Sequence, residues 1–476
     1  MTGFRATALS RIAGRPFLSA ALLFFAYSAC AAAAVQFIVL PYVLPSMHGG
    51  NGLMAGSDFL GYHGIAAHMA AAITHDGWSA WQLLPQGQSA AGVAAAIYAL
   101  TWPEPWVLIP YNAAMHAAGG IIIMRLIHIV TANVGVAFWS SVMYVALPSS
   151  MHWISQIQKD ATLFAGVLAI ILGLVMAVHA ACKAEKPSGM YPAAAITLAG
   201  LVLVALSKMY VLELIRAVTL ILAIVIAPAV LRLWTRKELP LQRIGLLAVF
   251  FAATIFVAGT FSSERRFDRE LPNLSLPQGV GGEGAPADPD QSWQGNQFLP
   301  EVLDQNLKRL AVARNGWTGR DLAHAGSMID LELNLTSPGR FLAYLPRALQ
   351  VGFAAPFPEH WIVTGAAPAR AAMRALAGLE MLLLYPVLFI GLPLAAWRWR
   401  HRVELWMIVI AGTALLLVFT YAIPNLGALY RLRYGFLMLL AALGTAALLE
   451  SRARLSRSKA PEQNRAAELT HTHGLG

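Results

Sequence analysis

The sequence predicts an all-α, multi-pass membrane protein with about ten transmembrane helices and both termini on the cytoplasmic side. Three observations predict this class: an apolar composition, apolar runs that recur along the chain, and basic residues gathered on alternate turns. Of the 476 residues, 58% are hydrophobic and only 12% are charged, whereas soluble domains have about 45–50% apolar and about 25% charged residues. Together with a mean hydropathy of +0.59, this composition excludes a water-soluble globular protein.

The apolar runs are long enough to cross a bilayer, since each spanning helix needs about 20 mostly apolar residues. Ten runs meet this length, at 17–44, 106–126, 132–149, 161–181, 190–207, 217–233, 244–261, 378–397, 405–422 and 434–450. For the first run a cleaved signal peptide is the alternative, because basic residues precede an apolar core with small residues near 28–31. That run continues well past the small residues, which favours a retained helix.

The distribution of charge sets the expected orientation. With the N-terminus inside, the inner turns and tail hold 18 basic and 6 acidic residues, and the outer side holds 16 basic and 18 acidic residues. Such an excess of basic residues on the inner side is the usual bias of membrane proteins. The net charge of +10 is therefore a topology signal, and nucleic-acid binding is not predicted. We expect the protein in the inner (cytoplasmic) membrane.

The chain is predicted to form one transmembrane unit over residues 1–450, followed by a basic, disordered cytoplasmic tail at 451–476. Two larger outer-face (periplasmic) segments are expected, at about 45–105 and 262–377. In the second, a Gly-, Pro- and Asp-rich loop at 277–294 precedes two amphipathic helices at 298–314 and 339–353, which are predicted to lie on the membrane surface. The two cysteines are far apart and have no metal-ligand spacing.

Basic residues also stand where short outer loops normally avoid them, at the outer ends of predicted helices near 150–160, 208–216 and 423–434. They are Lys159, Lys208, Arg216, Arg431 and Arg433. One interpretation is that they reach lipid phosphates or pair with nearby acids. We favour a site for a lipid-borne phosphate, because the guanidinium fork suits bidentate phosphate contacts. The predicted phosphate ligands are Lys159, Arg431, Arg433 and Arg216, supported by Asp160, Tyr430 and Tyr434.

The first outer segment offers a carboxylate. Asp58 follows a Gly-rich turn, and Ser57 is the predicted N-cap of a short helix that begins there. An acid in a first helical turn is often only a favourable dipole contact, and the alternative is a general base. Glu104, between two prolines, is a second acidic candidate, and Tyr62 lies one turn after Asp58.

Other polar residues predict structural roles. Asn112 and His116 are one turn apart on the second predicted span, which indicates buried hydrogen bonds between helices. His63 and His68 lie near Asp58 but match no metal-ligand motif. The sequence has no P-loop, dinucleotide fingerprint, HExxH motif or nucleophile elbow.

The order of these residues resembles a known family. The pattern comprises Asp58 with Tyr62, Asn112, Pro148 before Lys159-Asp160, Arg216, and the late turn Asn425-x-Gly427 followed by Arg431-x-Arg433-Tyr434. Over about residues 15–450 this layout is similar to the GT-C superfamily of polytopic glycosyltransferases, especially members from bacterial surface-polysaccharide loci. The resemblance implies a GT-C-like fold, a polyprenyl-phosphate-linked sugar donor and a lipid or glycan acceptor at the outer face.

The resemblance also implies a role for Asp58. An acidic residue of the first outer loop serves as the base in that family, and Asp58 occupies the matching position. Many members carry paired acids there, whereas Ser57 precedes Asp58 in this chain. The base and a possible divalent cation are therefore left open, and no other cofactor is implied.

Two alternative functions follow from the same features. A polymerase or ligase for O-antigen or exopolysaccharide would use lipid-diphosphate oligosaccharides, and the long outer segment would suit its larger acceptor. A transporter of lipid-linked glycans would carry charges at mid-bilayer and often repeated halves. The sequence has its unusual charges at helix ends and no internal repeat, which favours sugar transfer.

Overall fold

The computed structural model describes residues 15–55, 58–182, 189–261, 293–318, 327–362 and 368–472. Within these ranges, nine helical runs are long and apolar enough to cross a membrane, and a bent pair of helices makes a tenth. The runs are Pro16–Val43, Pro105–Thr131, Val134–Ala146 with Pro148–Ile154, Asp160–Cys182, Met190–Ser207, Val211–Thr235, Leu241–Thr260, Ala371–Arg398, Val403–Ala422 and Tyr434–Ala453. Each predicted apolar run matches one of them, so the chain is a multi-pass membrane protein.

The helices follow one another with few strands between them. The longer α-helices are α2 (Pro16–Ala34), α3 (Asp58–Asp76), α4 (Ser89–Leu100), α5 (Ile109–Thr131), α6 (Val134–Ala146), α8 (Asp160–Cys182), α9 (Met190–Ser207), α10 (Val211–Thr235), α11 (Leu241–Phe261), α14 (Glu301–Thr318), α15 (Pro338–Ala354), α16 (Pro368–Pro386), α18 (Val403–Ala422) and α20 (Tyr434–Thr472). The short ones are α7 (Pro148–Ile154), α17 (Leu392–Arg398) and α19 (Leu426–Leu432), and the strands β1 (His48–Gly50) and β2 (Leu53–Met54) form an antiparallel pair. Two π-helical turns, Val35–Val43 and Val387–Gly391, continue α2 and α16, and single 3₁₀ turns lie at Pro45–Met47, Trp78–Ala80, Pro85–Gly87, Pro105–Leu108 and Pro358–His360.

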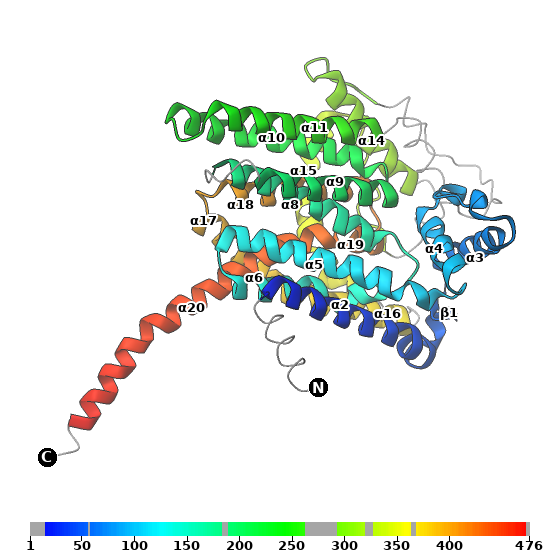
Figure 1. Cartoon of the computed structure of the whole chain (residues 1–476), viewed down its shortest axis with the longest axis horizontal. Helices are drawn as coiled ribbons and strands as arrows, with labels where there is room; N and C mark the ends of the chain where they lie inside the picture. Colours follow the sequence, from blue (N-terminus) through cyan, green and yellow to red (C-terminus); the bar gives the residue numbers. More distant parts are fainter. Residues whose placement is uncertain are drawn as a thin grey trace.

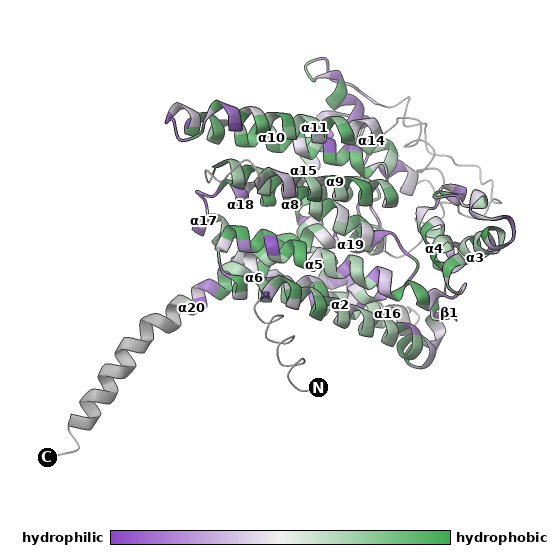
Figure 2. Ribbon diagram, in the orientation of Figure 1, coloured by the Kyte–Doolittle hydropathy of each residue, from purple (hydrophilic) through white to green (hydrophobic). Residues whose placement is uncertain are grey.

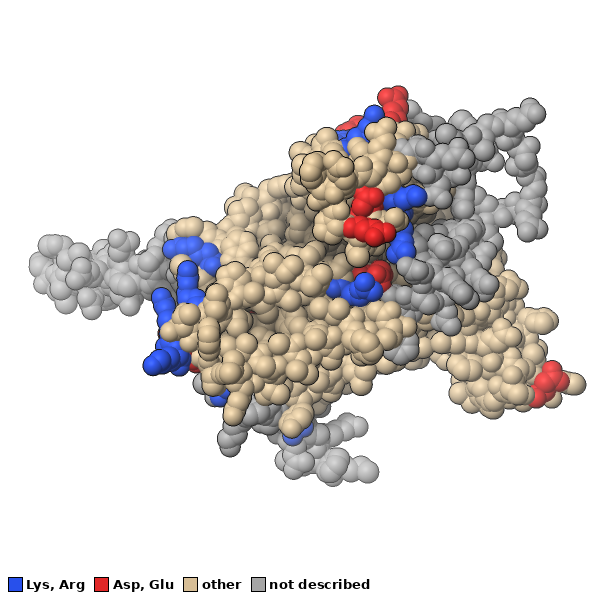
Figure 3. Space-filling view, turned by 90° about the horizontal axis from the view of Figure 1, so that it is seen from above, with Lys and Arg blue, Asp and Glu red and all other residues tan. Residues whose placement is uncertain are grey.

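The long helices lie side by side and give the molecule two distinct ends (Figure 1). We call the end with α3, α4 and α19 the loop end, and the end with α17, from which α20 projects, the tail end. Figure 2 shows that the spanning helices are predominantly hydrophobic along their length. On the face in Figure 3, Lys and Arg gather at the tail end and acidic and basic residues mix toward the loop end, with a broad surface free of described charges between them.

Helix α8 is the centre of the bundle, because nearly all of its residues are buried. Small residues let α9 approach it closely: a Cβ atom built on Gly200 would lie 2.6 Å from the carbonyl oxygen of Gly166. This packing holds the N-terminal end of α8 next to the C-terminal end of α9. Asp160 begins α8 and Lys208 follows α9, so both are held at the loop end.

The third predicted span differs in shape from the expectation. Its helix bends by 58° between α6 and α7, and the chain stays helical to Ile154. The expected outer turn is therefore shorter than predicted at its beginning, because Ser149, Ser150 and Trp153 are buried in α7. Pro148 accounts for the bend, since a proline cannot continue α6 but is well placed to start a new helix.

The two predicted amphipathic helices of the second outer segment are present as α14 and α15. The buried face of α15, with Phe341, Tyr344 and Ala348, packs with Tyr421 of α18 in a small hydrophobic core. This part of the apolar face of α15 thus packs on protein, whereas Leu342 and Leu349 of the same helix are exposed. The loop predicted at 277–294 falls almost entirely outside the described residues.

The segment predicted to be the first outer one forms a helical hairpin, α3 and α4, with its own core that includes Phe59, Ala70 and Tyr98. It is reached through a tight turn in which Gly50, Asn51 and Gly52 all have positive φ angles, between 51° and 102°. Glycine adopts such angles without steric cost. The predicted N-cap Ser57 lies outside the described residues.

Helix α20 continues to Thr472, through most of the segment 451–476 that the sequence predicts to be a disordered cytoplasmic tail. The segment is rich in Ala, Leu, Arg, Glu and Lys, which have high helix propensity. Its many charged residues indicated solvent exposure, and they do not by themselves exclude a helix.

Candidate active site

A cavity of about 750 Å³ opens at the loop end. Its walls come from α3, the turn before α4, the segments before α8 and α10, and the helices α10, α14, α18 and α19. The lining residues are Asp58, Gly61, Tyr62, Ile65, Gln86, Gly87, Gln88, Gln158, Lys159, Lys208, Tyr210, Leu214, Leu310, Ala313, Trp317, Val418, Phe419, Ala422, Ile423, Ala428, Arg431 and Leu432. Its volume falls in the range of about 300–1,000 Å³ that is usual for small-molecule sites.

One face of α3 supplies the acidic wall. Asp58, Gly61, Tyr62 and Ile65 all line the cavity, and their spacing places them on one side of the helix. The Asp58 side chain is exposed. Burial raises the pKa of Tyr62, and the nearby Asp58 carboxylate raises it further. Tyr62 is therefore a neutral hydrogen-bonding group beside an accessible carboxylate.

The opposite wall is basic and is organised by a buried carboxylate. Asp160 is fully buried at the start of α8. Lys208 Nζ lies 3.3 Å from its Oδ1 atom, and Arg431 Nε lies 3.0 Å from its Oδ2 atom. Lys208, Arg431 and Lys159 all line the cavity. Two cations therefore contact one buried anion, and Lys159 lies beside them in the lining, so positive side chains outnumber negative ones among the described residues of this wall.

A third wall is apolar. Leu310, Ala313 and Trp317 of α14 face Val418 and Phe419 of α18 across the cavity lining. Arg314 fixes α14 in this position. It is 1% exposed and donates to the carbonyl oxygens of Tyr421 (3.3 Å), Ile329 (3.4 Å) and Asp330 (2.9 Å).

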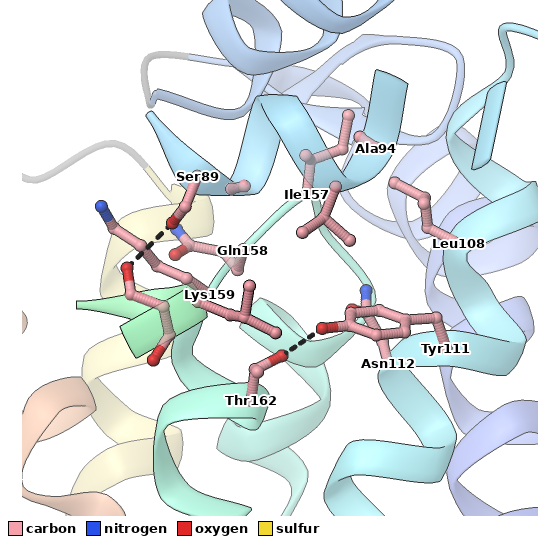
Figure 4. A pocket seen from close by; sticks show the side chains of 13 residues that line it. Ser89, Ala94, Leu108, Tyr111, Asn112, Ile157, Gln158, Lys159 and Thr162 are labelled. Carbon is pink, nitrogen blue, oxygen red and sulfur yellow. Dashed lines mark hydrogen bonds between the residues drawn. The ribbon is translucent and has the colours of Figure 1, made fainter. Parts of the chain in front are cut away.

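A second, narrow cavity adjoins the first and shares Gln158 and Lys159 with it. Figure 4 shows Ser89, Gln158 and Lys159 on one side of this hollow and Leu108, Tyr111 and Asn112 on the other. The Tyr111 hydroxyl and the Thr162 hydroxyl are 2.8 Å apart at its base. With a volume of about 20 Å³, it has room for about one water molecule.

The structure brings Asp58, Tyr62, Lys159 and Arg431 together at this cavity, with Asp160 directly behind the basic wall. Asn425 helps to position Arg431, since its side-chain oxygen accepts a hydrogen bond from the Ala428 backbone N–H and so caps α19.

Arg433 is placed differently from the prediction. It is 1% exposed and does not line the cavity. Its guanidinium donates to the carbonyl oxygens of Val351, Gly352 and Ala355 at the end of α15. The Val351 carbonyl oxygen also accepts from the Ala355 backbone N–H at 3.2 Å, and carbonyls at a helix C-terminus commonly lack intrahelical partners. Arg433 therefore caps α15 and is not a residue of the phosphate site. Burial lowers its pKa to about 10, which leaves it charged at neutral pH.

The predicted tyrosines also have structural partners. Tyr430 donates to Oε2 of Glu380 at 2.5 Å, and Tyr434 donates to the Tyr144 carbonyl oxygen at 2.5 Å. Glu380 is 2% exposed and also accepts from the Ser149 backbone N–H at 2.7 Å, which is at the start of α7. These contacts join α7, α16 and α19 below the cavity.

Two further predicted residues lie away from the cavity lining. Arg216 pairs with Glu213 at 3.3 Å on α10. Glu104 lies near His63 and Tyr98, whose side chains are 3.0 Å apart. His63 points to a different side of α3 from Asp58, and burial lowers its pKa.

The predicted buried hydrogen bonds of the second span are confirmed for Asn112, whose side-chain nitrogen donates to the Gln156 carbonyl oxygen at 2.9 Å. His116 is 1% exposed and stacks on Tyr144, with ring centroids 4.8 Å apart. Both residues stabilise helix packing.

Comparison with protein-family models, curated proteins and solved structures finds no match to this chain. The function is therefore inferred from the residues of the cavity. Among the described residues no cluster of three or more His, Cys, Asp and Glu side chains is suited to a metal ion. In the part of the cavity lining that the structure describes, Asp58 is the one acidic side chain, beside three cations.

The sequence analysis placed Lys208 in the basic set at the outer helix ends but did not name it as a phosphate ligand, and it gave no site role to Glu380 or to the wall formed by α14. Lys208 and Glu380 carried a usable signal, because each is a charge within or beside an apolar run. The position of α14 over the cavity had no local signal, since it depends on contacts between distant segments.

Proposed function

We propose that this chain is a membrane glycosyltransferase that moves a sugar from a polyprenyl-phosphate-linked donor to a lipid or glycan acceptor. The observation that carries the proposal is the cavity that joins an accessible carboxylate, a basic wall and an apolar wall. An amphiphile with a phosphate headgroup matches the basic and apolar walls. The loop end would then be the outer face of the inner membrane, where the acceptor arrives.

The chemistry needs one base and one anion site. The acceptor hydroxyl attacks the anomeric carbon while Asp58 takes its proton. The bond between the anomeric carbon and the donor phosphate oxygen breaks, and the electron pair stays on the phosphate. Lys159 and Arg431 stabilise the charge that builds there, because fixed cations cost no reorganisation as the bond breaks.

The charge of the site matches this reaction. Among the described residues at the cavity, Lys159, Lys208 and Arg431 with Asp160 and an ionised Asp58 sum to one positive charge, which is opposite to the single negative charge of a phosphodiester donor. After Asp58 is protonated the sum is two positive charges, and a free phosphate monoester carries nearly two negative charges at pH 7. A diphosphate donor, as in the polymerase or ligase alternative, would leave an uncompensated negative charge at both stages.

The test is the fate of the donor with the reconstituted, purified protein. We expect release of polyprenyl phosphate from a polyprenyl-phosphate sugar in the presence of acceptor glycolipids, and its loss in Asp58→Asn. Turnover of diphosphate-linked oligosaccharides alone would favour the polymerase or ligase. Movement of the donor across the bilayer without bond cleavage would favour the transporter and contradict the proposal.

A further inference from the structure

Lys208 and Arg431 reach the same carboxylate from different helices. Lys208 follows α9 and Arg431 is in the last turn of α19, while Asp160 begins α8 between them. Each carboxylate oxygen of Asp160 has one cation, at 3.3 Å and 3.0 Å. The Asp160 side chain is 1% exposed, whereas both cations also line the cavity. The carboxylate is therefore placed to hold the cations rather than to meet a ligand.

The contacts leave each cation able to bind a ligand. Arg431 approaches Asp160 through Nε, and a guanidinium has four further N–H donors on its two terminal nitrogens. An ammonium has three donors, and the Asp160 contact of Lys208 uses one. Lys208 is buried and Arg431 is partly exposed, and two cations that share one anion carry excess positive charge, which a bound anion would compensate.

We propose that Lys208 is a phosphate-binding residue of this cavity and that Asp160 is the positioning residue that holds Lys208 and Arg431 for that anion. The proposal rests on the proposed function for the identity of the phosphate carrier. It moves Lys208 from the general basic set of the sequence analysis to a direct phosphate contact, and it gives Asp160 the role of positioning both cations.

The setting of Lys208 makes its contribution depend on pH. Burial lowers its pKa to about 8, and the nearby Lys159 and Arg431 lower it while Asp160 opposes them. The other groups that face the cavity beside it are Tyr210 and, on α3, Asp58 and Tyr62. The pKa of Tyr62 is raised, so Tyr62 stays neutral through this range. The Lys208 ammonium, and its phosphate contact, is thus lost as pH rises through about 8.

The experiment measures binding of polyprenyl monophosphate, without a sugar, to the full chain in nanodiscs of zwitterionic lipid between pH 7 and 9.5. The second pKa of a phosphate monoester is about 6, so the probe keeps its charge over this range. For the unmodified chain we expect affinity to fall about tenfold or more across the range. Lys208→Arg should keep its affinity throughout, because arginine does not titrate there. Lys208→Met should bind roughly 10- to 100-fold more weakly at pH 7, with little pH dependence.

Arg340→Met is the matched control. Arg340, on α15, donates to the Asn334 carbonyl oxygen and does not line the cavity. The affinity and pH profile of this variant should therefore match those of the unmodified chain. If Lys208→Met does not fold, the comparison of Lys208→Arg with the unmodified chain decides the question. Equal affinity and equal pH slopes for the unmodified chain and the Lys208 variants would overturn the assignment.

Asp160→Asn tests the positioning role by the sign of its effect. If Asp160 only repelled the phosphate, its removal would strengthen probe binding. If it positions the two cations, Asp160→Asn should weaken binding several-fold although it removes a negative charge. Tighter binding would overturn the positioning role. Because the probe has no sugar, binding that depends on Lys208 without any sugar transfer would contradict the proposed function alone.

Discussion

Single residues at the loop end divide into those that line the cavity and those that hold helices together. Asp58, Lys159, Lys208 and Arg431 line the cavity. Arg433 is two residues from Arg431 but is directed into the core, where it donates to three carbonyl oxygens. Two arginines that look equivalent in the sequence therefore have separate roles, and substitution should separate them.

Asp58→Asn tests the base. Asparagine keeps the size and hydrogen bonding of the side chain but removes its basicity, so turnover should fall by about 10²–10⁴-fold. Donor binding should stay nearly unchanged, because the carboxylate acts on the acceptor. The measurement is transfer rate and donor affinity on the same purified protein. Asp76→Asn is the matched control, since Asp76 ends the same helix outside the cavity. Near-normal turnover in Asp58→Asn would exclude Asp58 as the base.

Arg433→Met tests the capping role. Its loss removes the guanidinium donor of the Gly352 and Ala355 carbonyl oxygens at the end of α15, and each buried group left unsatisfied costs about 1–3 kcal/mol. We expect a clearly lower melting temperature in detergent, and we expect Arg431→Met to weaken donor binding with a smaller effect on stability. Arg433→Lys should restore only part of the loss, because an ammonium cannot span the carbonyls as a guanidinium fork does. A stable Arg433→Met protein that fails to bind donor would show that Arg433 binds the donor phosphate and contradict the capping role.

At the scale of elements, the close contact of α8 with α9 sets the position of the basic wall. Gly166, Gly173 and Gly200 lie on this interface, and the hydroxyl of Thr197 would be 2.0 Å from a Cβ atom on Gly173. Small residues at such positions let helix backbones approach in a membrane. The distance between Asp160 and Lys208 at the loop end depends on this approach.

Gly200→Ala tests that dependence. The new methyl group would lie 2.6 Å from the Gly166 carbonyl oxygen and 2.9 Å from the Ile170 backbone nitrogen, so the helices must move apart. We expect a loss of about 1–3 kcal/mol in stability and weaker donor binding. Gly245→Ala is the control, because Gly245 is also helical and a Cβ atom there has no atoms within 4 Å. Equal melting temperatures for the two variants would show that the contact is not tight.

At the scale of the whole molecule, the cavity can meet a periplasmic acceptor only if the loop end faces outward. The excess of basic residues on the tail-end turns predicts this orientation. Figure 3 shows the same residue class gathered at that end. The structure fixes the two ends relative to each other, and an experiment must assign their compartments.

Cysteine labelling provides the assignment. In a chain with Cys30 and Cys182 replaced by serine, Ser79→Cys lies at the loop end and His401→Cys in the turn between α17 and α18, and both positions are exposed. A membrane-impermeant maleimide should label Ser79→Cys in intact spheroplasts and His401→Cys only after permeabilisation. The reverse pattern would place the cavity in the cytoplasm and refute the proposed acceptor route.

The sequence alone determined the membrane class and the ten apolar runs, because burial in lipid requires about 20 apolar residues for each crossing wherever the helix later packs. It also indicated Asp58, Lys159 and Arg431, since charges next to apolar runs stand out locally. Only the tertiary structure decided that Arg433 caps α15, that Asp160 joins Lys208 to Arg431, and that α14 covers the cavity. These contacts join segments far apart in the chain, and their partners are set by helix packing, which leaves no signal in local composition.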